Sequence, residues 1–355
     1  MALVHAAYRH ERGGHCGSGA LRDLTEWAGL RWTARPPTEG LVFALSGGLD
    51  FSYVRSNALL PPIYLVGRGA DLEENFLTNL GARFEVRSTD DPDLGWKWVT
   101  DQVDHGTPVM VWADIAELPY LRARLSMSRH DIVIAGYDDD QQIAYVVDND
   151  RDTTQAVPYE NLRRARSSTG FPVPTRHTTY VVDWPAEPPG LPPIAGAALR
   201  RSAEALATTI ETAPIVVRSD AAALGNGTGG VKVFADDLAV WSEVFDDETL
   251  ESALFTLSAL IEKAGTGGGL FRRLQAEGCR EVAAILDCDL AAAAADAARH
   301  AAHMWTEVAA AAYDSSAPVR RRAAATAEAA TELPRAEEKL TEALRLAGDA
   351  LLDSR

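Results

Sequence analysis

The chain changes character at a proline-rich stretch, WPAEPPGLPPIAG, at residues 184–196. Before this stretch, short runs of β-branched and aromatic residues alternate with helical patterns. After it, alanine-rich sequence that favours helix continues to the last residue, with almost no strand candidates. We therefore predict an α+β domain with an antiparallel sheet at 1–183, a linker at 184–196 and an all-α domain at 197–355. The strand candidates are PIYLVGR, PVMVWAD, DIVIAGY, IAYVVD and TTYVVDW.

Two glycine clusters interrupt the second half, GNGTGG at 225–230 and GTGGG at 265–269. Neither is followed by the Lys-Ser or Lys-Thr of a phosphate-binding loop, so we interpret both as turns between helices. Five consecutive alanines at 291–295 belong to an apolar stripe at helical spacing. They predict a packed helix rather than a linker.

The net charge of the chain argues against a nucleic-acid partner and favours a cationic small substrate. The chain has 51 acidic and 34 basic residues, a formal net charge of -17. A nucleic-acid surface needs the opposite balance, whereas a cationic small substrate is attracted by this one. No apolar stretch is long enough for a membrane helix or has the form of a secretory signal, so we expect a cytoplasmic protein without a membrane partner.

Cysteine and histidine spacings predict neither disulfides nor a metal site. Cys16, Cys279 and Cys288 form no disulfide framework and no paired zinc pattern. His300 and His303 form an HxxH pattern, but no further ligand stands at a suitable spacing. We expect a reducing compartment, no metal and no cofactor.

Cys16 precedes a helical pattern carried by Leu21, Leu24 and Trp27 or Ala28. At a helix N-terminus, unpaired backbone N–H groups and the helix dipole favour the reactive thiolate. The same N–H groups can stabilise the oxyanion of a tetrahedral intermediate. The segment alone is equally compatible with a small buried core thiol.

The stretch RHDIVIAGYDDDQQIAYVVDND predicts a β-hairpin with strands at 131–136 and 143–147. A turn centred near Asp139 places His130 opposite Asp148 on one face, and slippage by one residue substitutes Asn149. A carboxylate beside an imidazole fixes its tautomer and orientation. Taken with Cys16, the pair predicts a Cys–His–Asp triad, although a histidine at a strand end is more often structural.

These motifs resemble the butirosin-biosynthesis protein H N-terminal domain family, a papain-like group close to the bacteriocin-processing cysteine peptidases. The second half resembles the helical domain that commonly follows it. The resemblance rests on HCGSGALRDL at 15–24, FALSGGLDFSYV at 43–54, GTPVMVWADIAELPY at 106–120, HDIVIAGYDDD at 130–140, YVVDND at 145–150, NLRRARSS at 161–168, GTGGVKVFADDLAVW at 227–241, GTGGGLFRRL at 265–274 and MWTEVA at 304–309.

The resemblance implies a papain-like fold with Cys16 as nucleophile, His130 as base and Asp148 as orienter. The family's named member moves an acyl chain from a carrier-protein thioester onto an aminoglycoside amine. Papain-like enzymes often have Gln six residues before the nucleophile as an oxyanion donor, and this chain has His10 there. Around the base, Arg129 and Asp131 replace the family's small residues.

The leading functional hypothesis is acyl transfer in natural-product (antibiotic) biosynthesis, from an acyl carrier protein or coenzyme A-like thioester onto a small amine. Candidate oxyanion or neighbouring residues are His10, Gly17 and Asn149. A cysteine hydrolase, acting as a peptidase, amidase or thioesterase, would use the same triad with water as the acceptor. A third class is a binding protein with a degenerate site.

Overall fold

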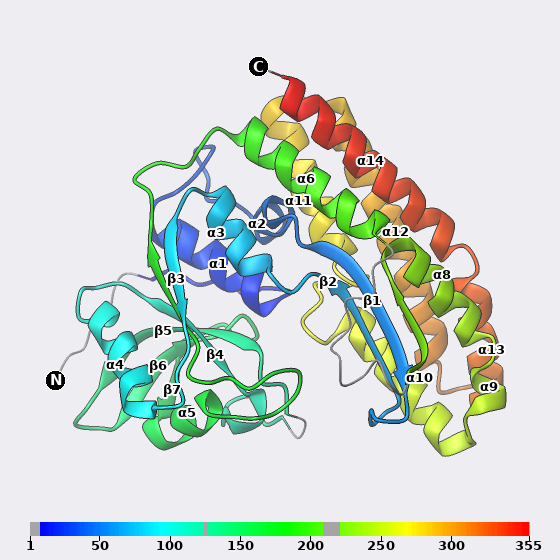
Figure 1. Cartoon of the computed structure of the whole chain (residues 1–355), viewed down its shortest axis with the longest axis horizontal. Coiled ribbons are helices and arrows are strands. Elements are labelled where there is room, and N and C mark those ends of the chain that lie inside the picture. Colours follow the sequence, from blue (N-terminus) through cyan, green and yellow to red (C-terminus); the bar gives the residue numbers. More distant parts are fainter. Residues whose placement is uncertain (1–7, 124–125, 209–220, 355) are drawn as a thin grey trace. The chain divides into compact units, whose positions relative to one another are not determined.

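The structure is a computed structural model that describes residues 8–123, 126–208 and 221–354 (Figure 1). Contacts divide the chain into two compact units. The first comprises Met1–Glu39 and Leu80–Pro189, and the second comprises Gly40–Asn79 and Gly190–Arg355. This division differs from the single cut expected at 184–196, because Gly40–Asn79 packs with the C-terminal half.

The first unit is built on a six-stranded sheet in the order β3-β8-β4-β5-β6-β7, with every neighbouring pair antiparallel (Figure 1). This confirms the α+β class expected for the N-terminal half. Its strands are β3 (Arg83–Arg87), β4 (Val109–Ala113), β5 (His130–Asp138), β6 (Ile143–Val147), β7 (Gln155–Pro158) and β8 (Thr179–Asp183). Its helices are α1 (Cys16–Trp27), α4 (Pro92–Val103), the short 3-10 helix η1 (Ile115–Glu117) and α5 (Tyr159–Arg166).

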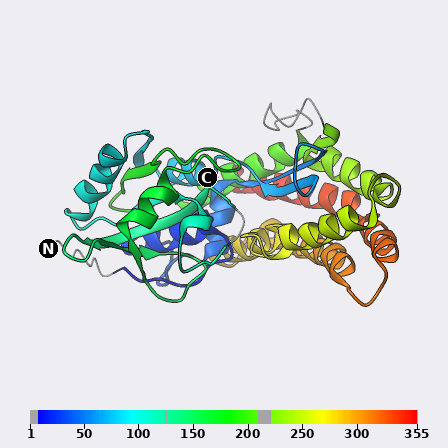
Figure 2. The same cartoon turned by 90° about the horizontal axis from the view of Figure 1, so that it is seen from below.

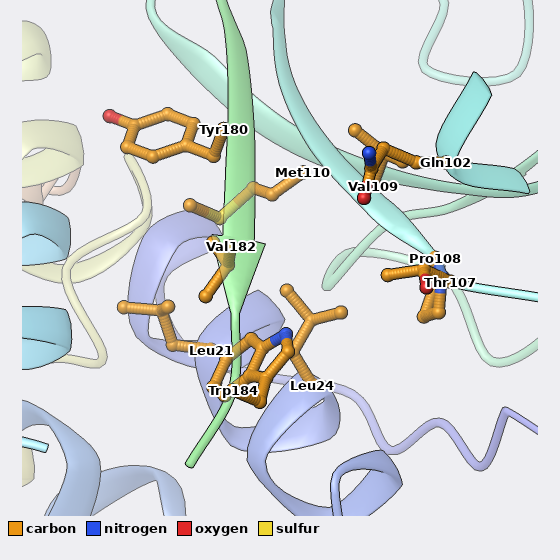
Figure 3. Close-up of a pocket in the computed structure, with 10 residues that line it drawn as sticks. All are labelled: Leu21, Leu24, Gln102, Thr107, Pro108, Val109, Met110, Tyr180, Val182 and Trp184. Atoms are coloured by element: carbon orange, nitrogen blue, oxygen red, sulfur yellow. The ribbon is translucent and has the colours of Figure 1, made fainter. Parts of the chain in front are cut away.

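The two faces of this sheet bury different helices. Side chains alternate along a strand, so Met110 and Val111 of β4 point in opposite directions. Val111 lies in the core that also holds residues of α4 and α5. Met110 lies beside Leu21 of α1 (Figure 3). Helix α1 therefore packs on one face of the sheet, and α4 and α5 pack on the other.

The hairpin of β5 and β6 forms as predicted, but its register differs. A turn centred at Asp139 would set Val133 opposite Tyr145, whereas Val133 pairs with Val147. The register shifts again at a bulge between Ile134 and Gly136, where the extra residue changes which side chains share a face. Beyond the bulge, the offset from the expected register is an even number of residues, so His130 keeps the face that was expected for it.

The second unit combines a three-stranded sheet, in the order β2-β1-β9, with a set of helices. The long helices α12 and α14 run alongside each other, in orange and red, in both Figure 1 and Figure 2. The strands are β1 (Leu49–Ser56), β2 (Ile63–Arg68) and β9 (Ala221–Asn226). The helices are α2 (Glu39–Ser46), α3 (Leu72–Asn79), α6 (Leu191–Ala207), α8 (Gly227–Leu238), α9 (Trp241–Val244), α10 (Asp247–Glu262), α11 (Arg272–Leu286), α12 (Asp289–Tyr313), α13 (Val319–Ala330) and α14 (Leu333–Asp353).

Strand pairing and aromatic packing explain why Gly40–Asn79 belongs to the second unit. Strand β1 pairs with β9, from the C-terminal half, along most of its length. The ring of Phe51 on β1 stacks on Trp305 of α12, with centroids 5.6 Å apart. Both side chains are fully buried. Removing Gly40–Asn79 from this unit would leave these apolar surfaces exposed to water.

Two expectations for the C-terminal half need correction. The cluster GNGTGG is not a turn between helices, because it ends β9 and begins α8 directly. Gly225 and Gly230 approach so closely that a Cβ on Gly225 would lie 2.6 Å from the Cα of Gly230. The linker is also shorter than expected, because α6 begins at Leu191 with prolines in its first turn, where proline is well tolerated.

The other local expectations for this half are confirmed. The GTGGG cluster joins α10 to α11, and the five alanines lie within α12. Across the described ranges, no helix combines the length and apolar character needed to cross a membrane.

Candidate active site

Cys16 is the first residue of α1 and is almost fully buried, with 8% of its surface exposed. The residue before it, His15, caps the helix because its Nδ1 accepts a hydrogen bond from the backbone N–H of Ser18 at 3.1 Å. The first bond within the helix runs from the N–H of Gly19 to the carbonyl of His15. The N–H of Gly17 therefore has no acceptor within the helix, and it lies next to the thiol.

Glu39 holds the segment that leads into α1. Its carboxylate accepts hydrogen bonds from the backbone N–H of Gly14 at 2.7 Å, the N–H of His15 at 2.9 Å and the hydroxyl of Ser18 at 2.9 Å. A carboxylate is well suited to this place because the N-terminal end of a helix carries partial positive charge. The position of Cys16 thus depends on a side chain that the sequence interpretation did not single out.

The other end of α1 is fixed by apolar packing on the sheet. Figure 3 shows Leu21 and Leu24 of α1 facing Val182 and Trp184, with Met110 nearby. The space left between these side chains is about 10 Å³, which is room for about one water molecule. This face is therefore a packing contact that anchors the helix and has no room for a substrate.

His130 and Asp148 form the pair that the hairpin predicted. The Nε2 atom of His130 lies 2.8 Å from Oδ2 of Asp148, and both side chains are largely buried. Asp148 follows the last residue of β6 and reaches His130 diagonally, because the register has shifted by an even number of residues. Asn149, the alternative for a slipped register, does not make this contact.

Cys16 is close enough to His130 to affect its pKa. Burial alone lowers the pKa of His130, but the charge and hydrogen bond of Asp148, followed by those of Cys16, raise it well above the usual value. Since Nε2 is bonded to Asp148, Nδ1 is the ring nitrogen left for the thiol. A cationic imidazole beside a thiol favours the thiolate, which is the reactive form of a cysteine.

Asp148 is held by more than the histidine. Its Oδ2 also accepts a hydrogen bond from the hydroxyl of Tyr120 at 2.7 Å, and its Oδ1 accepts one from the N–H of Asp150 at 3.0 Å. Burial raises the pKa of Asp148, but His130, Tyr120 and Asp150 together lower it to about 2. The carboxylate is therefore charged throughout the physiological range, and it is fixed in orientation.

Tyr120 and Glu39 are the two site residues that sequence reasoning missed. Tyr120 closes the motif GTPVMVWADIAELPY, but no local pattern indicates that its hydroxyl turns to Asp148, 28 positions later. Glu39 lies 21 positions beyond Ser18 and begins a different helix. The only signal available was the presence of Tyr120 in a motif that carried the family resemblance.

Of the three candidate oxyanion residues, the geometry favours Gly17. Both ring nitrogens of His10 face acceptors, Asp23 at 2.6 Å and the carbonyl of Arg151 at 2.5 Å. Burial lowers the pKa of His10, but these two acceptors raise it above the usual value. His10 therefore serves as a cationic link between Asp23 and Arg151, and neither nitrogen is left to donate to an oxyanion.

Asn149 has a bridging position. Its backbone carbonyl accepts a hydrogen bond from the N–H of Gly13 at 3.0 Å, and its side-chain amide donates to the carbonyl of Gly13 at 3.2 Å. The Cβ of Asn149 also lies where a Cβ on Gly19 would approach it to 3.2 Å. Asn149 thus ties the end of the hairpin to the segment before Cys16.

The two residues that flank His130 in the sequence, Arg129 and Asp131, take different positions. Arg129 lies over the ring of Trp112, with its guanidinium carbon 4.9 Å from the ring centroid. Asp131 is buried, and its Oδ2 lies 3.7 Å from the sulfur of Cys16. Cys16 therefore has one acidic group, Asp131, at hydrogen-bonding distance for sulfur, and a negative charge there opposes formation of the thiolate.

The remaining cysteines have no comparable setting. Cys279 is fully buried in α11, and burial raises the pKa of its thiol to about 12 although a hydrogen bond from Gln275 lowers it. Cys288 precedes α12 as its N-terminal cap residue, half-buried. Such a high pKa makes Cys279 a poor nucleophile.

Two family models match the chain, one after the other along the sequence. Residues 15–149, which include Cys16, His130 and Asp148, match the family described as butirosin biosynthesis protein H, N-terminal. Residues 160–344 match a second family, described as a domain of unknown function, DUF4872. No curated protein matches the chain. The N-terminal match spans the whole site, and the two matches follow each other in the order that the sequence motifs predicted. The chain therefore belongs to the DUF4872 family, whose model covers more than half of it, and its N-terminal part is similar to the butirosin biosynthesis protein H N-terminal family.

Proposed function

We propose that this protein is a cysteine-dependent acyltransferase of a natural-product pathway, which moves an acyl group from a thioester onto an amine. The observation that carries the proposal is the 2.8 Å contact between His130 and Asp148, with His130 also interacting with Cys16 at the start of α1. The family name, which refers to the biosynthesis of butirosin, supports the pathway.

In the first half-reaction, the thiolate of Cys16 attacks the thioester carbonyl, and the bond to the departing thiolate breaks. His130 gives its proton to that leaving group. The N–H of Gly17 is the donor best placed to stabilise the tetrahedral oxyanion. The product of this step is an acyl-cysteine and a free donor thiol.

In the second half-reaction, the amine nitrogen attacks the acyl-cysteine. His130, now neutral, takes a proton from that nitrogen, the new amide bond forms, and Cys16 leaves as a thiolate. Asp148 and Tyr120 keep the imidazole oriented for both proton transfers. The acidic balance of the chain and the buried Asp131 beside the sulfur favour an amine that arrives as a cation; it releases one proton to water before its neutral nitrogen attacks, and His130 takes the second.

Intact-protein mass spectrometry tests the proposal. The protein is incubated with short- and long-chain acyl-coenzyme A and acyl-pantetheine thioesters, and the expected result is one acyl group on Cys16. Cys16→Ala should stay unmodified, whereas the control Cys288→Ala should be acylated like the wild type.

A chase with polyamines and aminoglycosides then separates the two chemistries. Amide formation supports transfer. Release of free acid with every amine would instead identify a thioesterase, amidase or peptidase with the same catalytic residues. Acylation that persists in Cys16→Ala would overturn the nucleophile assignment.

A further inference from the structure

The first unit contains a pocket of about 460 Å³ formed mainly by α4, α5 and the turn between β5 and β6. Trp96 and Tyr159 form an aromatic wall, with ring centroids 4.9 Å apart, and both pack on the core of the sheet. This core lies on the face opposite α1. The pocket is therefore separate from the Cys16 site.

Arg166 lines this pocket as a buried cation without a countercharge. Its side chain donates to the carbonyl of His177 at 2.9 Å and the hydroxyl of Thr179 at 2.6 Å, and more weakly to the carbonyl of Gly95 at 3.4 Å. All of these acceptors are neutral, and among the described residues its Nε has no partner. Burial lowers the pKa of the Arg166 guanidinium to about 9, the expected direction for a charge removed from water without compensation.

His177 provides a second buried polar atom in the same pocket that has no hydrogen-bond partner among the described residues. Burial, and then the positive charge of Arg166, lower the pKa of His177 to about 4, so the ring is neutral at physiological pH. Its Nε2 is buried, and no described group hydrogen-bonds to it. The residue also has a φ of 48°, an uncommon conformation for a side chain other than glycine, and such strain concentrates at functional sites.

We propose that this pocket binds a small organic carboxylate, with its negative charge toward Arg166 and His177 and its body against Trp96 and Tyr159. An anion here would compensate the guanidinium charge. It would also accept a hydrogen bond from Nε of Arg166, which otherwise has no acceptor among the described residues. The volume is far larger than one inorganic ion needs, and the aromatic wall suits an organic body. The lining holds two carboxylates, Asp93 and Glu160, against two guanidinium groups, Arg163 and Arg166, so it has no surplus positive charge for a dianion such as a phosphate ester.

Calorimetric titration of the full-length wild-type protein with benzoate, butyrate, inorganic phosphate and the neutral isostere benzamide tests this proposal. We expect benzoate to bind, butyrate to bind more weakly, and benzamide and phosphate not to bind. Arg166→Gln keeps a hydrogen-bonding side chain but removes the charge, and it should weaken benzoate binding by about 10-fold or more. Arg164→Gln is the matched control on the same helix, since Arg164 is not among the residues that line the pocket and its guanidinium pairs with Glu117 at 2.8 Å, and it should change the affinity less than about twofold.

A second measurement keeps the test decisive if Arg166→Gln fails to fold. Benzoate should change the tryptophan fluorescence of the wild type, and Trp96→Phe should remove that change while retaining binding. Binding of benzamide as tight as that of benzoate, binding of phosphate alone, or no binding of either carboxylate by the wild type would overturn the proposal. So would equal affinity of a folded Arg166→Gln protein for benzoate.

Discussion

At the scale of single residues, the proposed reactivity of Cys16 depends on the negative charge of Asp148. Asp148 contacts His130, and His130 in turn interacts with Cys16. Asp148 is ionised down to a pH of about 2, and its charge keeps the pKa of His130 high although burial opposes this. His130 therefore stays protonated above its ordinary pKa of about 6.5, and in the proposed mechanism its positive charge stabilises a thiolate at Cys16.

This coupling predicts how Cys16 alkylation depends on pH. Wild-type Cys16 should react with iodoacetamide at pH 6, because a raised pKa of His130 means that the imidazolium persists there. In His130→Ala the thiol should titrate near its ordinary pKa of about 8.5, so the rate at pH 6 should fall by roughly 100-fold. Both rates are measured by quenching the reaction at set times and quantifying the alkylated Cys16 peptide by mass spectrometry, with the Cys288 peptide as the internal reference. Identical pH profiles for the two proteins would contradict the ion pair.

Tyr120→Phe tests the second support of Asp148. Loss of the 2.7 Å hydrogen bond should raise the pKa of Asp148 and loosen the imidazole. A hydrogen bond to a charged group contributes about 1.5–3 kcal/mol, so we expect acyl transfer to slow by about 10-fold or more. The alkylation profile of Cys16 should also move toward that of His130→Ala. A slower reaction with an unchanged alkylation profile would mean that Tyr120 acts only through structure.

Three residues of this site, Cys16, His130 and Asp148, could be predicted because local sequence patterns mark them. Cys16 precedes a helical pattern, and His130 and Asp148 lie on two strands of one hairpin. Tyr120 and Glu39 join the site only through tertiary contacts, and no periodicity along the chain encodes those. His10 was considered for the oxyanion because of its spacing from Cys16, but Asp23 and the carbonyl of Arg151 occupy both of its nitrogens.

At the scale of secondary-structure elements, the N-terminal end of α1 depends on one carboxylate. Glu39→Ala removes three hydrogen bonds to Gly14, His15 and Ser18, two of them to backbone N–H groups. We expect the free energy of unfolding to fall by about 2–3 kcal/mol, as measured by urea denaturation. The control Glu26→Ala removes only a 3.4 Å contact with the exposed Arg9 and should change stability by less than about 0.5 kcal/mol. Equal losses in the two variants would exclude this role for Glu39.

Element types were easier to predict than their exact pairing. The five strand candidates are all strands, because alternating β-branched runs are a strong local signal. The register of the β5–β6 hairpin could not be read in the same way, since the pairing of Asp138 with Ile143 centres the turn between Asp140 and Gln141 and not at Asp139. A bulge between Ile134 and Gly136 then shifts the pairing by one residue. Strand β9 was missed because its residues, AAALGN, have helix-favouring alanine where strands usually have β-branched side chains.

At the scale of the whole molecule, the sequence predicted the helical half but not the return of Gly40–Asn79 to it. The reason is that β1 finds its second partner, β9, about half the chain away. A composition change along the chain marks where one kind of sequence gives way to another. It does not reveal that an earlier segment completes a later unit.

This division predicts the behaviour of an excised N-terminal half. The fragment 1–183 retains β1 but lacks β9 and Trp305, so Phe51 and its neighbours lose their burial. We expect this fragment to bind a hydrophobic dye and to aggregate. A matched fragment with Gly40–Asn79 replaced by a flexible Gly/Ser linker of similar length should be more soluble and keep the alkylation profile of Cys16. A monomeric 1–183 fragment with a cooperative unfolding transition would contradict the prediction.

The pairing of β1 with β9 also has a consequence for synthesis on the ribosome. Strand β1 emerges long before β9, and during that interval one of its edges has no partner. Unpaired apolar edges are prone to associate with other chains, and pairings distant in sequence form slowly. Nascent chains of this protein should therefore need protection by a chaperone until residues beyond Asn226 have been made.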